Sequence, residues 1–214
     1  MIEALILYLV FFLPGLMSSG FTAVEVQSIP FSPVWELNRI ITYIIPALAL
    51  IWYIVLRKKS LSSLKPLRMW RQDLLSFAIG LTGLISIALA ISFIISLLSR
   101  YYGLISPPQV EAPENIPGWI VMVIACLGTG YLEESYFRYY LLTKLRKYNL
   151  PSKVILSTVL FAFSHIHDGF WGILNALLAG ILLSLLFIRY RSLHGTALAH
   201  GAYNIFVYTM GVFL

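Results

Sequence analysis

Long apolar segments alternate with short polar ones along the whole chain. A bilayer core is crossed by about 20 apolar residues in a helix. Segments of this kind predict membrane helices over residues 3–17, 38–56, 74–98, 118–143, 152–166, 170–188 and 193–213. Eight helices would result if 193–213 were broken and a further piece lay elsewhere. The pattern predicts an all-α fold, a polytopic membrane bundle of about seven transmembrane helices.

The composition agrees with this prediction. The chain has 214 residues, of which 59% are hydrophobic and 11% charged, and its mean hydropathy is +0.85. A soluble domain carries roughly 25% charged residues. The length indicates a single domain over residues 1–214, embedded in a lipid bilayer. The single cysteine, Cys126, lies in an apolar run, which argues against disulfides and thiolate zinc sites.

The net charge of +6 does not indicate a nucleic-acid partner, because the basic residues form short clusters between apolar segments. Such clusters orient a membrane protein, with the basic loops in the cytoplasm. They lie at 57–72, at 144–153 and at Arg189 and Arg191, whereas 18–37 and 101–117 contain no lysine or arginine. Seven spans bring every cluster to one side and predict a cytoplasmic N-terminus.

The first apolar segment is interpreted as a membrane helix and not as a secretory signal. A signal peptide begins with basic residues. Here Glu3 stands near the start, and no lysine or arginine precedes Arg39.

Three ionisable residues interrupt the fourth apolar segment. The stretch "GYLEESYFRYYLL", residues 130–142, contains Glu133, Glu134 and Arg138. Each costs about 2.5–3.5 kcal/mol at the centre of a membrane helix, so they should face protein or water. Glu134 and Arg138 have the i,i+4 spacing of an ion pair. Glu133 lies about 100° around the helix from Glu134 and is left for other chemistry. The structural alternative is that Glu133 only bonds a hydroxyl.

Further polar residues follow in two later segments. "FAFSHIHDGF" contains His165 and His167, and "HGTALAHGAYNIF" contains His194, His200 and Asn204. Counting about 1.5 Å per residue from the nearest basic cluster gives depths of roughly 14–20 Å for Glu133, His165, His200 and Asn204. Three helices are therefore expected to bring these four side chains to one level of the membrane.

This set of side chains suits the attack of water on an acyl carbon, most naturally that of a peptide bond. A buried glutamate can act as a general base, and a histidine can orient the water. A second histidine and an asparagine can donate hydrogen bonds to an oxyanion. Zinc bound by Glu133, His165 and His200 is the competing interpretation. Because no H-E-x-x-H motif is present and asparagine is a poor zinc ligand, we expect no metal and no cofactor.

The same residues resemble the motifs of type II CAAX prenyl endopeptidases, also called the CAAX protease and bacteriocin-processing family. The family patterns E-E-x-x-x-R, F-x-x-x-H and H-x-x-x-N are similar to "EESYFR", "FAFSH" and "HGAYN" here. The resemblance covers about residues 118–206, the motif-bearing core.

The resemblance implies a role for each motif residue. Glu133 and His165 would activate water, and His200 and Asn204 would form the oxyanion site. Glu134 and Arg138 would support them structurally. It also implies a glutamate-dependent intramembrane protease, and the short chain resembles microbial members, which suggests a microbial cell membrane.

Two positions qualify the resemblance. Tyr139 stands where family members often have glycine, so its ring is expected to narrow the cavity. His167 forms a second F-x-x-x-H with Phe163, but His165 is preferred because His167 adjoins the loop residues Asp168 and Gly169.

The predicted function is an intramembrane endopeptidase. Its substrate would be a prenylated CAAX-type C-terminus, a peptide leader or a membrane protein. The alternatives are a non-proteolytic scaffold or immunity protein of the same fold, and a proton-coupled transporter. A scaffold would not need Glu133, and the paired interrupted helices of many transporters are not evident.

Overall fold

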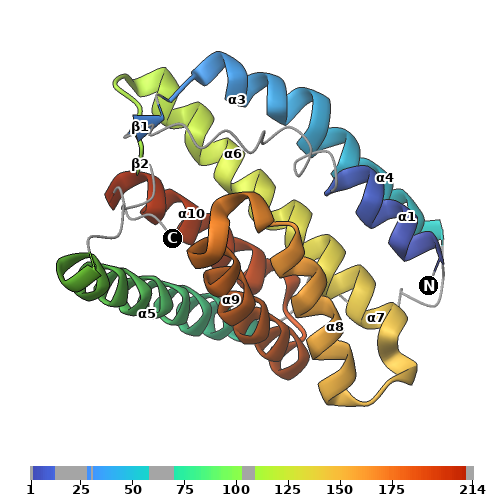
Figure 1. Cartoon of the computed structure of the whole chain (residues 1–214). Helices are drawn as coiled ribbons and strands as arrows, with labels where there is room; N and C mark the ends of the chain where they lie inside the picture. The colour runs from blue at the N-terminus through green and yellow to red at the C-terminus, as the bar shows by residue number, and fades with distance from the viewer. Residues whose placement is uncertain (1, 13–27, 30, 58–69, 103–108, 211–214) are drawn as a thin grey trace.

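The computed structural model describes residues 2–12, 28–29, 31–57, 70–102 and 109–210, and these form a bundle of helices (Figure 1). A helix lies in each of the seven ranges predicted from the apolar pattern, which confirms the all-α membrane fold. The helices, with their short π and 3-10 segments, are α1 (Ile2–Phe11), α3 (Pro33–Arg39), η1 (Ile40–Ile44), α4 (Ile45–Arg57), α5 (Trp70–Tyr102), α6 (Ile116–Glu134), η3 (Ser135–Leu141), α7 (Leu142–Lys144), η4 (Leu145–Lys147), α8 (Leu150–Phe163), η5 (Ile166–Asp168), α9 (Gly169–Tyr190) and α10 (Leu193–Met210).

Within the described ranges, four helical segments are each long and apolar enough to cross a membrane: Pro33–Arg57, Trp70–Tyr101, Ile116–Lys144 and Ile166–Tyr190. Two shorter apolar helices, α1 and α8, lie beside them. The helix α10 is unbroken over its described length, so the structure gives no reason to count an eighth piece there.

The segment between the predicted helices 74–98 and 118–143 is partly regular where the structure describes it. The helix α5 continues to Tyr102. Two short strands, β1 (Ser28–Ile29) and β2 (Gln109–Val110), pair in parallel, with Ser28 opposite Gln109.

Three helices begin with the same combination of a polar cap and a proline. The side chains of Ser32, Asn115 and Asn149 accept hydrogen bonds from backbone N–H groups at the starts of α3, α6 and α8, and each helix has a proline in its first two positions. A capping oxygen satisfies an N–H that has no helical partner, and proline lacks that N–H. These local signals fix where the site-bearing helices α6 and α8 begin.

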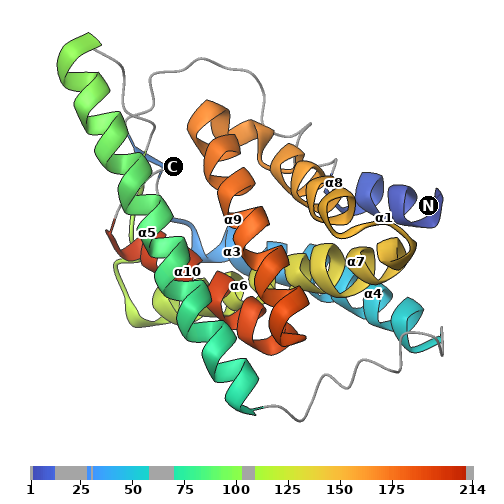
Figure 2. The ribbon, with the colours of Figure 1, turned by 90° about the horizontal axis from the view of Figure 1, so that it is seen from below.

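The bundle is built around one helix. Figure 1 shows α6, η3 and α7 as a continuous diagonal rod, and α10 packs against both α6 and α5. In the view from below, α5 and α1 lie on opposite sides of the bundle, with α9 and α8 between them (Figure 2). The side chains of η3 are all buried, as expected for the centre of a bundle.

Two glycines allow α6 and α10 to approach closely. A Cβ atom on Gly130 would lie 2.6 Å from the carbonyl oxygen of Ala197, and one on Gly201 would lie 2.9 Å from the Cα of Leu127. Small residues at a helix crossing permit backbone contact inside membrane bundles. The crossing lies one turn from Glu134 on α6 and beside His200 on α10, so it fixes the separation of these two side chains.

The helix α1 is fastened to the same central rod. The Tyr136 hydroxyl donates to the carbonyl of Ala4 at 2.6 Å, and the Tyr8 hydroxyl donates to the carbonyl of Leu160 at 2.9 Å. Glu3 accepts a hydrogen bond from the Tyr140 hydroxyl and pairs with Lys144 at 3.4 Å. The acidic residue that argued against a signal peptide therefore joins α1 to η3 and α7.

Candidate active site

The two adjacent glutamates end α6 and have different environments. The Glu134 side chain is fully buried, whereas that of Glu133 keeps 12% of its surface exposed and lines a cavity. The residues that follow form the π-helix η3, a rare conformation that is frequent at functional sites. The sequence pattern did not predict this π segment.

The expected ion pair between Glu134 and Arg138 is present. Arg138 Nη1 lies 2.8 Å from Glu134 Oε1, and both side chains are fully buried. The Arg138 guanidinium lies over the ring of Phe161, with its Cζ 4.4 Å from the ring centroid. A cation over an aromatic face is stabilised by the ring electrons, so Phe161 supplies part of the solvation that Arg138 has lost.

His200 contacts both glutamates. Its Nδ1 is 3.1 Å from Glu134 Oε1, and its Nε2 is 3.6 Å from Glu133 Oε2. The sequence assigned Glu134 to Arg138 alone, but the carboxylate is shared with His200. A histidine on α10 is thereby held against both acids of α6.

His165 approaches the same oxygen of Glu133 as His200 does. Its Nε2 is 4.0 Å from Glu133 Oε2, and within the described part of the chain neither atom has a hydrogen-bond partner, although both are buried. A water molecule placed beside this pair could hydrogen-bond to both atoms. Buried polar atoms are normally satisfied, so two facing unsatisfied atoms indicate a position for water or substrate.

Phe161 connects the three motifs by packing. Its ring centroid is 4.9 Å from that of His165 and 5.9 Å from that of His200, with edge-to-face geometry in both cases. Together with its contact to Arg138, this explains why a phenylalanine belongs one turn before the histidine. In the sequence, Phe161 was identified only as the first residue of the F-x-x-x-H motif, with no contact assigned to it.

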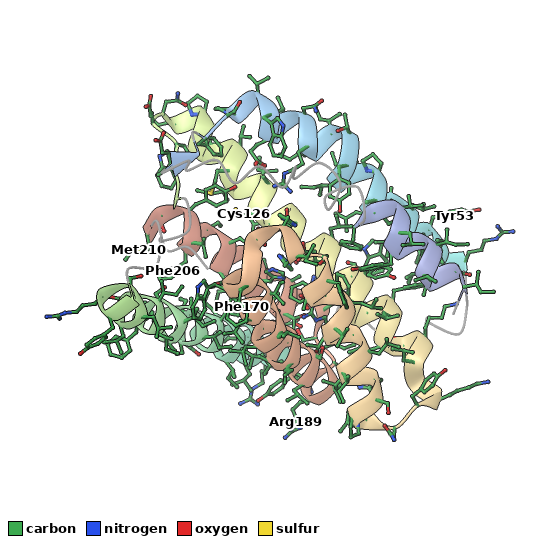
Figure 3. The ribbon with its side chains drawn as sticks, in the orientation of Figure 1. Tyr53, Cys126, Phe170, Arg189, Phe206 and Met210 are labelled. Atoms are coloured by element: carbon green, nitrogen blue, oxygen red, sulfur yellow. The ribbon has the colours of Figure 1, made fainter. Side chains whose placement is uncertain are left out.

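Two cavities meet at the candidate site. The larger, of about 730 Å³, is lined by Glu133 and by residues of α1, α3, η1 and α6, including the buried Cys126 (Figure 3). The smaller, of about 220 Å³, is lined by His200 and by residues of α5, α9 and α10. Both are lined by His165, Asp168, Asn204, Val207 and Tyr208. Asn204 thus lies on the wall shared by the two cavities.

Tyr139 does not narrow either cavity, contrary to the expectation from its bulk. Its ring stacks on Trp52 of α4, with centroids 5.3 Å apart, and meets the edge of Phe187 of α9. It is absent from the described lining of both cavities because η3 turns it toward the helix packing.

His167 lies apart from the glutamates. It lines the larger cavity, and its Nε2 is 3.3 Å from Asp168 Oδ1. Among the described histidines, His165 and His200 lie within 4.0 Å of Glu133 Oε2. The geometry therefore favours His165 over His167 as the histidine of the second motif.

Four polar residues near the site were not assigned to it from the sequence: Asp168, Glu36, Arg39 and Thr129. Asp168 accepts from His165 Nδ1 at 3.0 Å, although it was interpreted as a loop residue. Arg39 pairs with Glu36 at 2.7 Å and donates to the Thr129 hydroxyl at 3.1 Å on the wall of the larger cavity. The i,i+3 spacing of Glu36 and Arg39 in a helix is a sequence signal for an ion pair. The pair reaches the site only because α3 packs on α6.

No group of three or more His, Cys, Asp or Glu side chains is arranged to hold a metal ion in the described ranges. The zinc alternative would need Glu133, His165 and His200 to converge on one ion.

Comparison with known protein families identifies the segment that carries the site. Residues 115–206 match the family model of type II CAAX prenyl endopeptidase Rce1-like proteins. The match confirms the resemblance predicted from the motifs and covers the segment from Asn115 to Phe206, somewhat less than half of the chain. Comparison with curated proteins and with solved structures gives no match. The family and the apolar helices point to an integral membrane protein, and the family suggests a CAAX-type intramembrane protease.

Proposed function

We propose that this chain is an intramembrane endopeptidase in which Glu133 and His165 activate a water molecule for attack on a peptide bond. The match of residues 115–206 to type II CAAX prenyl endopeptidases is the premise for the reaction class. The observation that carries the mechanism is the facing pair of buried, unsatisfied atoms, Glu133 Oε2 and His165 Nε2, at 4.0 Å.

In the proposed first step, the water oxygen forms a bond to the carbonyl carbon of the substrate. The water gives one proton to the Glu133 carboxylate while His165 Nε2 holds its second hydrogen. The carbonyl oxygen takes up the negative charge of the tetrahedral intermediate. The protonated Glu133 then gives its proton to the nitrogen of the leaving amine, the C–N bond breaks, and a new carboxyl group and a free amine result.

The oxyanion of this intermediate needs hydrogen-bond donors. The Asn204 carboxamide lies on the wall shared by both cavities, and its NH₂ group can donate in every protonation state of its neighbours. His200 uses Nδ1 toward Glu134, so its Nε2 can donate only as an imidazolium. We therefore assign the oxyanion to Asn204 and to charged His200, with Glu134 and Arg138 holding His200 in position.

The two cavities support a peptide as substrate. They share the wall formed by His165 and Asn204, so a chain bound across these residues could occupy both. A prenylated C-terminus, a peptide leader and a membrane protein are the substrate classes we propose. The enzyme is proposed to act without a metal and in the cell membrane of a microbe, with its N-terminus in the cytoplasm.

The decisive experiment is cleavage of fluorogenic peptides by the purified protein in detergent, with and without a zinc chelator. We expect cleavage that survives the chelator, and a Glu133→Gln variant that is folded and inactive. Absence of cleavage by the wild type over a broad peptide library would favour the scaffold. One equivalent of copurifying zinc, lost in His165→Ala together with activity, would replace the metal-free mechanism with a zinc-bound water.

A further inference from the structure

Asp168 is an ionisable side chain at the candidate site to which the sequence motifs assign no role. Its Oδ2 lies 3.0 Å from His165 Nδ1, and it lines both cavities. We propose that Asp168 is a positioning residue that keeps His165 in the tautomer able to accept a hydrogen from the attacking water. The inference rests on the proposed function, in which His165 faces that water.

The pair is set by a local turn. Residues Ile166–Asp168 form the 3-10 turn η5, and the backbone N–H of Asp168 donates to the carbonyl of His165 at 3.0 Å. The turn ends at Gly169, whose φ of 74° lies in the left-handed region that favours glycine. Main chain and side chain thus both join Asp168 to His165 across three residues.

The hydrogen bond determines which ring nitrogen carries the proton. An ionised carboxylate can only accept hydrogen bonds, so neutral His165 must carry its hydrogen on Nδ1. Nε2 is then the free acceptor, and it is the atom that faces Glu133 Oε2 at 4.0 Å. The opposite tautomer would point an N–H at the water position and could not hold the second hydrogen of the water.

The surroundings of Asp168 determine how much activity its replacement should cost. The Asp168 side chain is 38% exposed, and its other oxygen, Oδ1, lies 3.3 Å from His167 Nε2. Solvent can therefore replace part of the lost interaction. Loss of an outer partner of an essential histidine costs about 10–100-fold in metal sites, and we expect a loss of this order in kcat.

The activity test uses Asp168→Asn and Asp168→Glu, with Glu114→Gln as a control. Glu114 is exposed and lies in another loop, so its variant makes the same carboxyl-to-amide change away from the site. For Asp168→Asn we expect kcat to fall about 10–100-fold with KM little changed, because the water-activating step is affected and not substrate binding. Asp168→Glu should recover part of the loss. An unchanged kcat in Asp168→Asn would overturn the inference.

A second readout does not depend on activity. The chain has four histidines, so the side-chain ¹⁵N resonances of labelled protein can be assigned by one His→Gln variant each. Recorded above the pH at which the ring is charged, wild-type His165 should show a protonated Nδ1, and Asp168→Ala should lose this preference. The same tautomer in both proteins would overturn the inference. If the wild type cleaves no peptide, the proposed protease fails, while this spectrum still decides the role of Asp168.

Discussion

His200 lies between two carboxylates that are adjacent in the sequence. Its Nδ1 is 3.1 Å from Glu134 Oε1, and its Nε2 is 3.6 Å from Glu133 Oε2. Only Glu134 is also paired with a buried arginine. One imidazole thus joins a structural acid to the acid that lines the larger cavity, and substitutions of the two glutamates should have different consequences.

Replacement of each glutamate by glutamine should have a different result: one variant should lose catalytic turnover and the other should lose stability. Glu133→Gln is nearly isosteric and cannot take a proton, so we expect a folded protein without measurable turnover. Glu134→Gln leaves the Arg138 charge buried and unpaired, a change that costs about 3–5 kcal/mol in soluble proteins. Thermal unfolding in detergent, measured with peptide cleavage, checks both expectations. Arg138→Met should behave like Glu134→Gln. A Glu133→Gln protein as unstable as these two would contradict the division.

The two histidines of the second motif should also differ. His165→Gln removes the nitrogen that faces Glu133 and should abolish cleavage, since water activation would depend on Glu133 alone. His167→Gln loses its contact with Asp168 and the stacking of its ring beside His165, but it leaves the nitrogen that faces Glu133 in place, so we expect its kcat to stay far closer to that of the wild type. Kinetics of both variants, with circular dichroism to verify folding, test the choice. The reverse ranking would assign the second motif to Phe163 and His167.

The sequence was informative where a local rule applied. The apolar pattern predicted helices in all seven ranges, and the i,i+4 spacing of Glu134 and Arg138 predicted their pair. The sequence did not predict the π segment after Glu134, because this segment depends on how the central rod packs. The π segment directs Tyr139 toward Trp52. The contact of His200 with both acids depends on the glycine crossing of α6 and α10. Such a crossing joins residues 66 positions apart, and no local pattern records it.

The glycine crossing can be tested directly. In Gly130→Ala the new methyl would lie 2.6 Å from a backbone oxygen of α10, so the helices must separate and the contact of His200 with Glu134 must lengthen. We expect lower thermal stability together with lower kcat. The control is Gly128→Ala on the same helix, whose methyl would lie 3.0 Å from a side-chain atom of Ile44, which can move. Equal effects of the two substitutions would show that the crossing does not govern the site.

The predicted orientation requires the two ends of the central rod to face opposite sides. Glu114 precedes α6, and Lys147 ends η4 in the basic cluster after α7. With Cys126 replaced by alanine, single cysteines at positions 114 and 147 should react with an impermeant reagent from opposite sides of the membrane. Basic loops remain in the cytoplasm, so position 147 should be protected in intact cells. Protection of position 114 instead would invert the proposed topology.

Asn204 provides the sharpest test of the oxyanion assignment, because its carboxamide donates whatever the charge of His200. In Asn204→Ala the developing negative charge loses one donor, which costs about 2.7–4 kcal/mol of transition-state stabilisation in a soluble protease. We therefore expect kcat to fall roughly 10²–10³-fold. KM should change little, because the hydrogen bond strengthens only in the transition state. Steady-state kinetics of wild type and variant on one peptide measure both quantities. A raised KM with unchanged kcat would assign Asn204 to substrate binding, and the charged His200 would then be the principal donor to the oxyanion.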